Sequence, residues 1–299
     1  MDIIEQFSSA LADRLAAAAP SVVALQGGTS KGGSRHRSGI LWRPDVVVTS
    51  EQVVGEQDSA VIIQGGTEVA ARLAGRDPTT NVAVFRLETP LPGGSPAQGS
   101  GPRVGSLALV VGADHAGAAT ARLAMVHATG PAWHSMAGGR IDTLIRLDVR
   151  LGSDEGGPVL DQAGALLGMS TSGPRRRGLV IPAATIARVV DPLLEHGHIA
   201  RGWLGVGLQP VAIPDQLQSA AGQARGAMVL QLVANGPAQQ AGVLPGDILL
   251  SIDDFRFGQR RGLASLMGPD RIGKAVTVRL QRAGEMKEIG VVIAARPKS

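Results

Sequence analysis

The 299-residue sequence has no cysteine and no tyrosine, and only 2% of its residues are aromatic. Without cysteine the chain can form neither disulfides nor thiolate metal sites, and it offers no thiol nucleophile. The scarcity of aromatic rings leaves the core to Val, Leu, Ile and Ala. Long apolar runs are missing as well. None approaches the ~20 residues that a membrane-spanning helix needs, so no membrane span is predicted.

Neither sign of charge is in large excess, because 29 Lys and Arg stand against 25 Asp and Glu, a net charge of +4. So small an excess requires no polyanion, and no nucleic-acid partner is predicted. Residues 1–5 include two acids and no basic residue, unlike the basic start of an export signal, which predicts a cytoplasmic protein.

Histidine is present but follows no metal-binding pattern. His196 and His198 form the only close pair, and that spacing is too common to indicate a ligand set. We therefore predict no metal and no other cofactor. The remaining histidines are scattered along the chain: His36, His115, His127 and His134.

What the sequence does contain is glycine, proline and short apolar runs. Forty-one glycines and 18 prolines without a regular period indicate many tight turns and hence β-rich structure. Residues 2–18 place apolar side chains at helical spacing before Pro20, which predicts an amphipathic helix that packs on the next domain or on another subunit. A second helix is predicted over residues 184–196.

Short apolar strands bounded by Gly, Pro, Asp or Asn follow one another without helices between them. Such spacing predicts antiparallel barrels, here two of them joined by the Gly/Pro/Ser connection at residues 90–102. The predicted strands are 21–25, 38–42, 46–49, 60–63 and 82–87, followed by 107–111, 122–126, 144–148, 159–160, 165–169 and 179–181.

The stretch Arg150–Pro158 carries the strongest functional signal. Its Gly156-Gly157-Pro158 turn, followed by two apolar strands, resembles the nucleophile loop of trypsin-like serine proteases, in which a serine precedes the two glycines. Glu155 occupies that position here. Further segments in the same order are similar to HtrA-type proteases, and together they extend the resemblance over nearly the whole chain: Pro20–Val23, Ser38–Ile40, Val47–Val54, Asp77–Val84, Leu179–Pro182 and His198–Val206.

The resemblance implies a mainly β fold in which a two-barrel chymotrypsin-like domain is followed by an α+β PDZ domain. The expected bounds are 1–20 for an N-terminal helix, 21–200 for the barrels and 201–299 for the PDZ domain. The resemblance also implies a homo-oligomer, a trimer in that family.

Three positions carry the family's catalytic triad, and by the resemblance they fall on Gln52, Asn81 and Glu155. Acyl transfer needs a nucleophile, a base near neutral pKa and a carboxylate that orients the base. None of the three side chains fits its role, so a protein that is not an enzyme, a pseudoprotease, is expected. Ser153 replaces a glycine of the oxyanion loop, and we expect the Glu155 carboxylate to occupy the oxyanion site as an internal acceptor.

The C-terminal third resembles a PDZ domain through residues 226–230, 234–241 and 242–252. In HtrA-type PDZ domains the loop equivalent to residues 203–206 donates backbone N–H groups to a peptide's terminal carboxylate. Small Gly205 lets the ligand approach the main chain. The implied peptide-binding residues are Trp203, Leu204, Gly205, Val206, Leu208, Leu263, Leu266 and Met267. Of the last four, at least two are expected to fill the core of the domain instead.

The predicted function is therefore that of a catalytically inactive HtrA-like protein that binds peptides or protein C-termini through its PDZ domain, as a scaffold, adaptor or regulator. Two alternatives stay open. One is an active serine endopeptidase with a non-standard site, for which Ser153 is the candidate nucleophile. The other is a metal-binding protein that reuses the barrel cleft.

Overall fold

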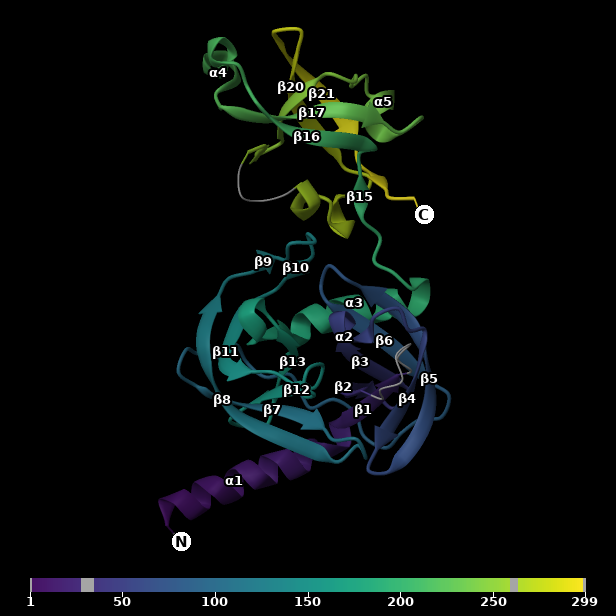
Figure 1. Ribbon diagram of the computed structural model, residues 1–299, viewed down its shortest axis with the longest axis vertical. Helices are drawn as coiled ribbons and strands as arrows, with labels where there is room; N and C mark the ends of the chain where they lie inside the picture. The colour runs from purple at the N-terminus through teal and green to yellow at the C-terminus, as the bar shows by residue number, and fades with distance from the viewer. Residues whose placement is uncertain (1, 28–34, 259–262, 298–299) are drawn as a thin grey trace. The chain divides into compact units, whose positions relative to one another are not determined.

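The computed structural model describes residues 2–27, 35–258 and 263–297. Two compact units make up the chain. The first consists of Met1–Ser135 and Arg140–Ile199, and the second of Ala200–Ser299 with the short segment Met136–Gly139. Strands predominate in both, and the first unit contains two closed barrels, which confirms the predicted fold class (Figure 1).

The first barrel closes because apolar residues from all of its strands point to one interior. Val23, Leu41, Val47 and Phe85 are buried there. Neighbouring strands pair antiparallel. In barrel order the strands are β1 (Val22–Gly27), β2 (Arg35–Arg43), β3 (Val46–Ser50), β6 (Val82–Leu87), β5 (Thr67–Asp77) and β4 (Ser59–Gln64).

The second barrel repeats this arrangement around Val110, Val126, Leu147 and Val159. Its strands in barrel order are β11 (Leu144–Arg150), β14 (Arg177–Pro182), β13 (Leu166–Ser172), β12 (Pro158–Asp161), β7 (Leu107–Ala113) and β8 (Ala119–Gly130). Shorter elements of the unit are η1 (Ala19–Ser21), α2 (Glu51–Val54), β9 (Trp133–His134), β10 (Arg140–Ile141) and η2 (Pro174–Arg176).

Helix α3 (Ala183–His196) joins the two barrels into one body. Ile186, Val190 and Leu193 belong to a buried cluster that also contains Ile40 of the first barrel and Met169 of the second. Figure 1 shows the helix beside β6 and β13. The predicted helix over 184–196 is thus confirmed, and its apolar face packs on residues of both barrels.

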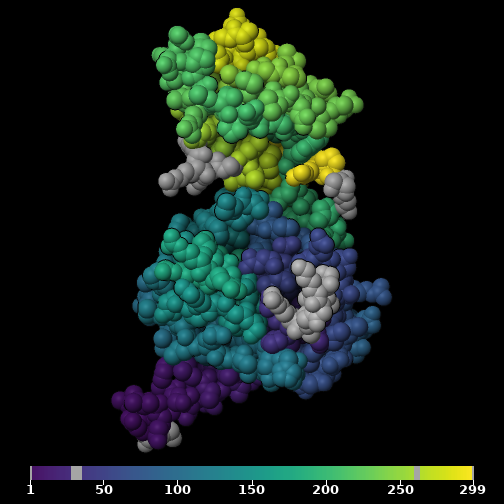
Figure 2. Space-filling view, in the orientation of Figure 1, coloured from purple at the N-terminus to yellow at the C-terminus, as the bar shows by residue number. Residues whose placement is uncertain are grey.

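The N-terminal helix α1 (Ile3–Ala18) is also confirmed, but only its second half is packed. Leu11 and Leu15 lie against the core. Ile3, Ile4 and Phe7 are exposed to 80%, 72% and 44%, and Figure 2 shows the helix standing out from the barrels. The second half of the helix thus packs on the following domain. Packing of the helix on another subunit stays a prediction.

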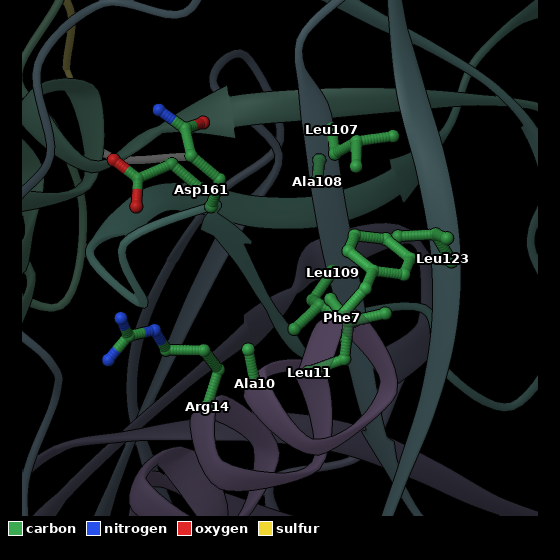
Figure 3. Close-up of a pocket in the computed structure, with 10 residues that line it drawn as sticks. Phe7, Ala10, Leu11, Arg14, Leu107, Ala108, Leu109, Leu123 and Asp161 are labelled. Atoms are coloured by element: carbon green, nitrogen blue, oxygen red, sulfur yellow. The ribbon is translucent and has the colours of Figure 1, made fainter. Parts of the chain in front are cut away.

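Between α1 and the second barrel lies an apolar cavity of about 200 Å³. Figure 3 shows Phe7 and Leu11 of the helix reaching toward Leu109 and Leu123 on β7 and β8. The cavity means that α1 covers this part of the barrel without filling the space against it.

The second unit contains one main sheet, in the order β16 (Val206–Ala212), β17 (Arg225–Leu232), β18 (Ile248–Ile252), β20 (Ala275–Arg282) and β21 (Glu285–Val292). Its core includes Val229, Leu249, Ile252, Val278 and Leu280. β16 is an edge strand of this sheet. The remaining elements are β15 (Gly202–Trp203), α4 (Asp215–Ala221), α5 (Pro237–Gln240), β19 (Phe255–Arg256), η3 (Leu263–Leu266), η4 (Pro269–Arg271) and β22 (Ala294–Ala295).

After β19 the described chain resumes at residue 263 with the short 3₁₀ helix η3. Residues 260–262 lie outside the described residues. No helix in the described parts of the chain is both long and apolar enough to cross a membrane.

Candidate functional site

Gln52, Asn81 and Glu155 come from three separate segments between strands and meet where the two barrels face each other. Gln52 lies on α2 directly after β3, Asn81 directly precedes β6, and Glu155 lies in the turn before β12. The Gln52 side-chain amide donates to Glu155 Oε1. The Gln52 backbone N–H donates to Asn81 Oδ1 at 2.9 Å. The structure therefore brings together all three positions that the resemblance singled out.

Asn81 sits in a backbone conformation that few residues adopt. Its φ is +59°, in the left-handed region that asparagine tolerates better than most residues. The turn before it is built by Asp77, whose carboxylate accepts hydrogen bonds from Thr79 N–H (3.1 Å) and the Thr80 hydroxyl (2.8 Å). This turn directs the Asn81 side chain toward the barrel interface.

Glu155 is buried, with 8% of its surface exposed, and its carboxylate is well supplied with donors. Ser172 donates from its backbone N–H to Oε1 at 3.0 Å and from its hydroxyl to Oε2 at 2.7 Å. Thr171 accepts from Gln52 Nε2 at 2.9 Å and from Asn81 Nδ2 at 2.6 Å. A closed polar cluster thus connects α2, the Asn81 turn, the Glu155 turn and the end of β13.

Thr171 and Ser172 were not predicted from the sequence as site residues. Their only local signal is that β13, otherwise apolar, ends in three consecutive hydroxyl residues, 170–172. A run of hydroxyls at a strand end is common, and only the barrel pairing shows that it faces Glu155.

The structure shows which groups hold the Glu155 carboxylate, while its role as an acceptor in the oxyanion site stays a prediction. The carboxylate turns to Gln52 and Ser172. Its own backbone N–H donates to Gly152 O at 3.3 Å within the turn. The side chain reaches β13, where donors are available, while the turn amide is already engaged locally.

The turn that carries Glu155 has room only for glycine at its next position. Gly156 has a φ of +94°, and a Cβ there would lie 2.3 Å from Ser38 O. The neighbouring Ser153 carbonyl accepts the Ser38 hydroxyl at 2.7 Å. The predicted candidate nucleophile Ser153 is therefore part of the contact between this turn and β2.

Asp154 is the second buried carboxylate of the turn, with 4% exposure. Oδ1 accepts from Arg122 Nε at 3.2 Å and from Gly152 N–H at 3.0 Å. Oδ2 has no hydrogen-bond partner among the described residues. Asp154 therefore points away from Glu155 and stabilises the turn.

The arrangement limits the chemistry at the three positions. Gln52 and Asn81 carry amides that have no basic nitrogen, and position 155 has no hydroxyl. Two hydroxyls of the cluster donate to the Glu155 carboxylate, that of Ser172 at 2.7 Å and that of Thr171 at 3.4 Å. Among the described residues no three His, Asp or Glu side chains gather closely enough to hold a metal ion.

The predicted carboxylate-binding loop is the segment from Trp203 to Val206. Gly205 has a φ of +74°, and a Cβ there would lie 3.2 Å from the Trp203 ring. Leu204 O accepts from the N–H of Ala238 (2.9 Å), and Gly205 O accepts from that of Val233 (2.8 Å). With both carbonyls held, the loop has a defined backbone that leads directly into the edge strand β16.

The four predicted pocket residues separate into two groups. Leu208, Leu263 and Leu266 are partly buried at the border of the core. Met267 is 8% exposed and belongs to the core itself, and its carbonyl accepts the Gly202 N–H at 3.0 Å. Leu204 is likewise a core residue, at 4% exposure, so only its backbone is available to a ligand.

Comparison with known proteins agrees with this division of the chain. Residues 37–169 match the trypsin-like peptidase domain, and residues 202–293 match the PDZ domain. Over 262 residues the sequence is 30% identical to a Brucella suis biovar 1 (strain 1330) protein named "Probable periplasmic serine endoprotease DegP-like", covering 84% of this chain and 50% of that one. A protein of the same name from Pseudomonas fulva (strain 12-X) is 26% identical over 282 residues, 89% of this chain and 58% of that one.

Solved structures are similar over nearly the whole chain. "HtrA-type protease AlgW with tripeptide" has a TM-score of 0.70 at 27% identity and covers 96% of this chain and 98% of its own. The serine endoprotease from Yersinia pestis has a TM-score of 0.66 at 22% identity, with 97% and 98% covered. The chain spans about half the length of the curated relatives it matches first.

These names contradict the prediction that the protein is not an enzyme. The relatives are named serine endoproteases and the similar structures HtrA-type proteases, so the comparisons point to an enzyme. The prediction of an inactive protein rested only on the residue types at positions 52, 81 and 155. The same cluster also contains other polar groups of the barrels, such as the Ser172 hydroxyl.

The predicted cytoplasmic location is contradicted as well. The curated relatives are named periplasmic, which points to an extracytoplasmic location. The prediction rested on two acidic residues among the first five. The similarity to proteins named periplasmic extends over more than four fifths of the chain and is therefore the stronger indication.

Proposed function

This chain is an HtrA-like protein, in which a trypsin-like peptidase domain is followed by a PDZ domain, and from that premise we propose that it binds the free C-terminus of a peptide or protein along β16. The observation that carries the proposal is the Trp203–Val206 loop. Hydrogen bonds to the carbonyls of Leu204 and Gly205 fix its backbone, and the chain continues from it into the edge strand β16. In this role the protein is a scaffold, adaptor or regulator that recruits chains with exposed ends.

Three features of the second unit support capture of a chain end. An edge strand offers unpaired backbone groups to an added strand. Gly205 keeps the entrance of the loop free of a side chain, so that a carboxylate can approach the main-chain N–H groups. Leu208, Leu263 and Leu266 offer partly buried apolar surface for the ligand's last side chain. The solved relative AlgW, named with a bound tripeptide, is consistent with such a ligand.

The test uses the full chain and peptides with free C-termini selected from a random decapeptide library. We expect binding by calorimetry to be lost when the same decapeptide is amidated, because the loop then has no carboxylate to accept its hydrogen bonds. Equal affinity for the free and amidated forms contradicts the proposal.

A matched pair of glycine variants locates the site. Gly205→Ala introduces a Cβ against Trp203 at the ligand's entrance, and we expect it to weaken binding at least tenfold. Gly222→Ala carries the same backbone strain, at φ +70°, with open space around its Cβ, and we expect it to leave the affinity unchanged. Equal losses in both variants would point to a general effect on folding.

We further propose that the chain forms homo-oligomers, a trimer by resemblance to HtrA-type proteins, through the first half of α1. Ile3 and Ile4 lie largely exposed there, and Phe7, which lines the cavity against the second barrel, is exposed to 44%. Three large apolar side chains at helical spacing on one uncovered helix are costly to leave in water.

Peptide hydrolysis at the barrel interface is a second candidate function, favoured by the names of the relatives. The Ser172 hydroxyl donates to Glu155 at 2.7 Å, which pairs a hydroxyl with a proton acceptor. Degradation of unfolded casein by the full chain is the test. Loss of activity in Ser172→Ala, but not in Ser153→Ala, supports this cluster, and the reverse result assigns the reaction to Ser153.

A further inference from the structure

The second barrel has a cavity of about 620 Å³ at β8, β9, β11 and β14. Apolar side chains form much of its wall, among them Trp133, Leu144 and Leu179. Among the described residues that line it, none belongs to the polar cluster around Glu155 and none to the second unit. The cavity is therefore separate from the three triad positions and from the proposed peptide site, and its size is that of a small-molecule site.

Three arginines bring positive charge to this cavity from different segments. Arg146 lies on β11, Arg175 on η2 and Arg177 at the start of β14. In the described part of the chain, none of these three side chains forms a hydrogen bond or an ion pair. Asp148, the one carboxylate of β11, accepts the Met125 N–H at 2.8 Å and does not line the cavity. The cavity thus carries positive charge that no lining carboxylate balances.

The loop that carries Arg175 is held in an uncommon conformation. Arg175 and Arg176 have φ angles of +59° and +58°, in the left-handed region that such residues rarely adopt. The Gly173 N–H donates to Arg177 O at 2.9 Å, and the Arg176 N–H donates to Gly173 O at 3.0 Å. This closed turn brings both Arg175 and Arg177 to the cavity, and a backbone held in so costly a form is typical of functional sites.

Trp133 gives the cavity an aromatic wall and an unpaired donor. Its Nε1 is buried and has no hydrogen-bond partner among the described residues. Buried donors in folded proteins are nearly always paired. An acceptor on a bound molecule that reached Nε1 would remove the cost of leaving it unpaired. His127 of β8 lines the same cavity and offers further ring nitrogens.

We infer that this cavity binds a small organic anion, in which a carboxylate, sulfonate or phosphate is attached to an apolar group. The guanidinium fork of arginine pairs with such a head group through two hydrogen bonds. Trp133, Leu144 and Leu179 offer the surface for the apolar part. A free inorganic anion would leave the apolar wall unused, and an uncharged molecule would leave the arginines unused.

Binding should also stabilise the second barrel. The pairing of β11 with β14 is interrupted, since its register shifts between Arg146 and Arg150. A molecule held by both Arg146 and Arg177 bridges the two strands at this interruption. Because the cavity exists only when the barrel is folded, the ligand raises the unfolding temperature of the first unit.

The experiment titrates the full chain with anilinonaphthalene sulfonate, a fluorescent dye that joins apolar rings to one negative charge. Phenylnaphthylamine has the same rings without the sulfonate and is the uncharged control. We expect Arg146→Gln/Arg177→Gln to weaken binding of the sulfonate at least about tenfold, because the guanidinium partners are lost. Binding of the uncharged dye should change less than about twofold, since it has no group for them.

A second double variant controls for overall charge. Arg72→Gln/Arg103→Gln removes two exposed arginines of the same unit that do not line the cavity, and we expect it to leave the affinity unchanged. Thermal unfolding without dye verifies that both double variants fold. With the sulfonate present, the unfolding temperature should rise in the unmodified protein and in this control, and not in Arg146→Gln/Arg177→Gln.

Competition against the bound dye identifies the head group. Decanoate and phenyl phosphate each join an apolar part to an anion, and the stronger competitor shows whether a carboxylate or a phosphate fits better. Equal affinity of the sulfonate for the two double variants overturns the inference, and so does a dye that neither compound displaces. Neither result bears on capture of a chain end, which belongs to the second unit and is tested with peptides.

Discussion

At the scale of single residues, Glu155 is a buried carboxylate stabilised by hydrogen-bond donors. The described part of the chain shows no Lys or Arg in an ion pair with it. Its burial is compensated by Gln52 and by two donors of Ser172. A buried charge is tolerated when its oxygens are satisfied in this way.

Removing the carboxylate should therefore destabilise the first unit. We expect Glu155→Ala to lower its free energy of unfolding by about 1–3 kcal/mol, because Ser172 and Gln52 lose their acceptor. Urea unfolding followed by circular dichroism measures the change. Glu56→Ala, at an exposed carboxylate of the same unit, is the control and should stay within about 0.5 kcal/mol of the unmodified protein. A Glu155→Ala variant as stable as this control contradicts the prediction.

At the scale of elements, an ion pair with a buried carboxylate connects the end of β20 to the residue before β18. Asp247 is 1% exposed and accepts from Arg282 Nε and Nη2, each at 2.8 Å, and from Leu244 N–H at 2.8 Å. The hydrogen bond to Asp247 raises the pKa of the Arg282 guanidinium. The same guanidinium donates to Gly242 O, so the pair ties the loop before β18 to the sheet.

We expect Asp247→Ala to lower the unfolding free energy of the second unit by about 1–3 kcal/mol, since three donors lose their acceptor in a buried place. Glu285→Ala removes an exposed carboxylate, 3.7 Å from Lys287, and should change it by less than about 1 kcal/mol. Differential scanning calorimetry resolves the two effects. A larger loss in Glu285→Ala than in Asp247→Ala would be the opposite of this expectation.

Most elements were predictable because their signal is local. All six strands of the second barrel and both long helices follow from apolar runs bounded by turn residues or from helical spacing. β5 was missed, although it has 11 residues. Its inward positions include the small Ala71 and Gly75, and arginines interrupt it, so it has no apolar run to detect. Its place between β4 and β6 depends on closure of the barrel.

At the scale of the whole molecule, the first half of α1 exposes apolar side chains that the described fold covers only in part. We expect the triple variant Ile3→Ser/Ile4→Ser/Phe7→Ser to shift the protein from an oligomer to a monomer, because it removes the apolar surface that association would bury. Sedimentation velocity measures the change.

The control for this variant uses polar positions on the same helix. Gln6→Ala/Ser9→Ala leaves the three apolar side chains in place and should leave the oligomeric state unchanged. A monomer before any substitution, or an oligomer that survives the triple variant, contradicts the role of this surface.

The structure supports the division of the chain near residue 200 but does not test the exact limits of the domains. The division of the chain near residue 200 follows from the contacts within each unit. The limits 21–200 and 201–299 stay a prediction, which the independent folding of two such fragments would test.

The sequence by itself determined the residue types at positions 52, 81 and 155 and the order of barrels and PDZ domain. These depend on neighbours along the chain. The tertiary structure alone decided that Glu155 turns to Ser172, that Met267 fills the core, and that Arg146 and Arg177 line one cavity. The reason is physical: these outcomes depend on which distant strands pair, and pairing is set by the packing of the entire barrel or sheet.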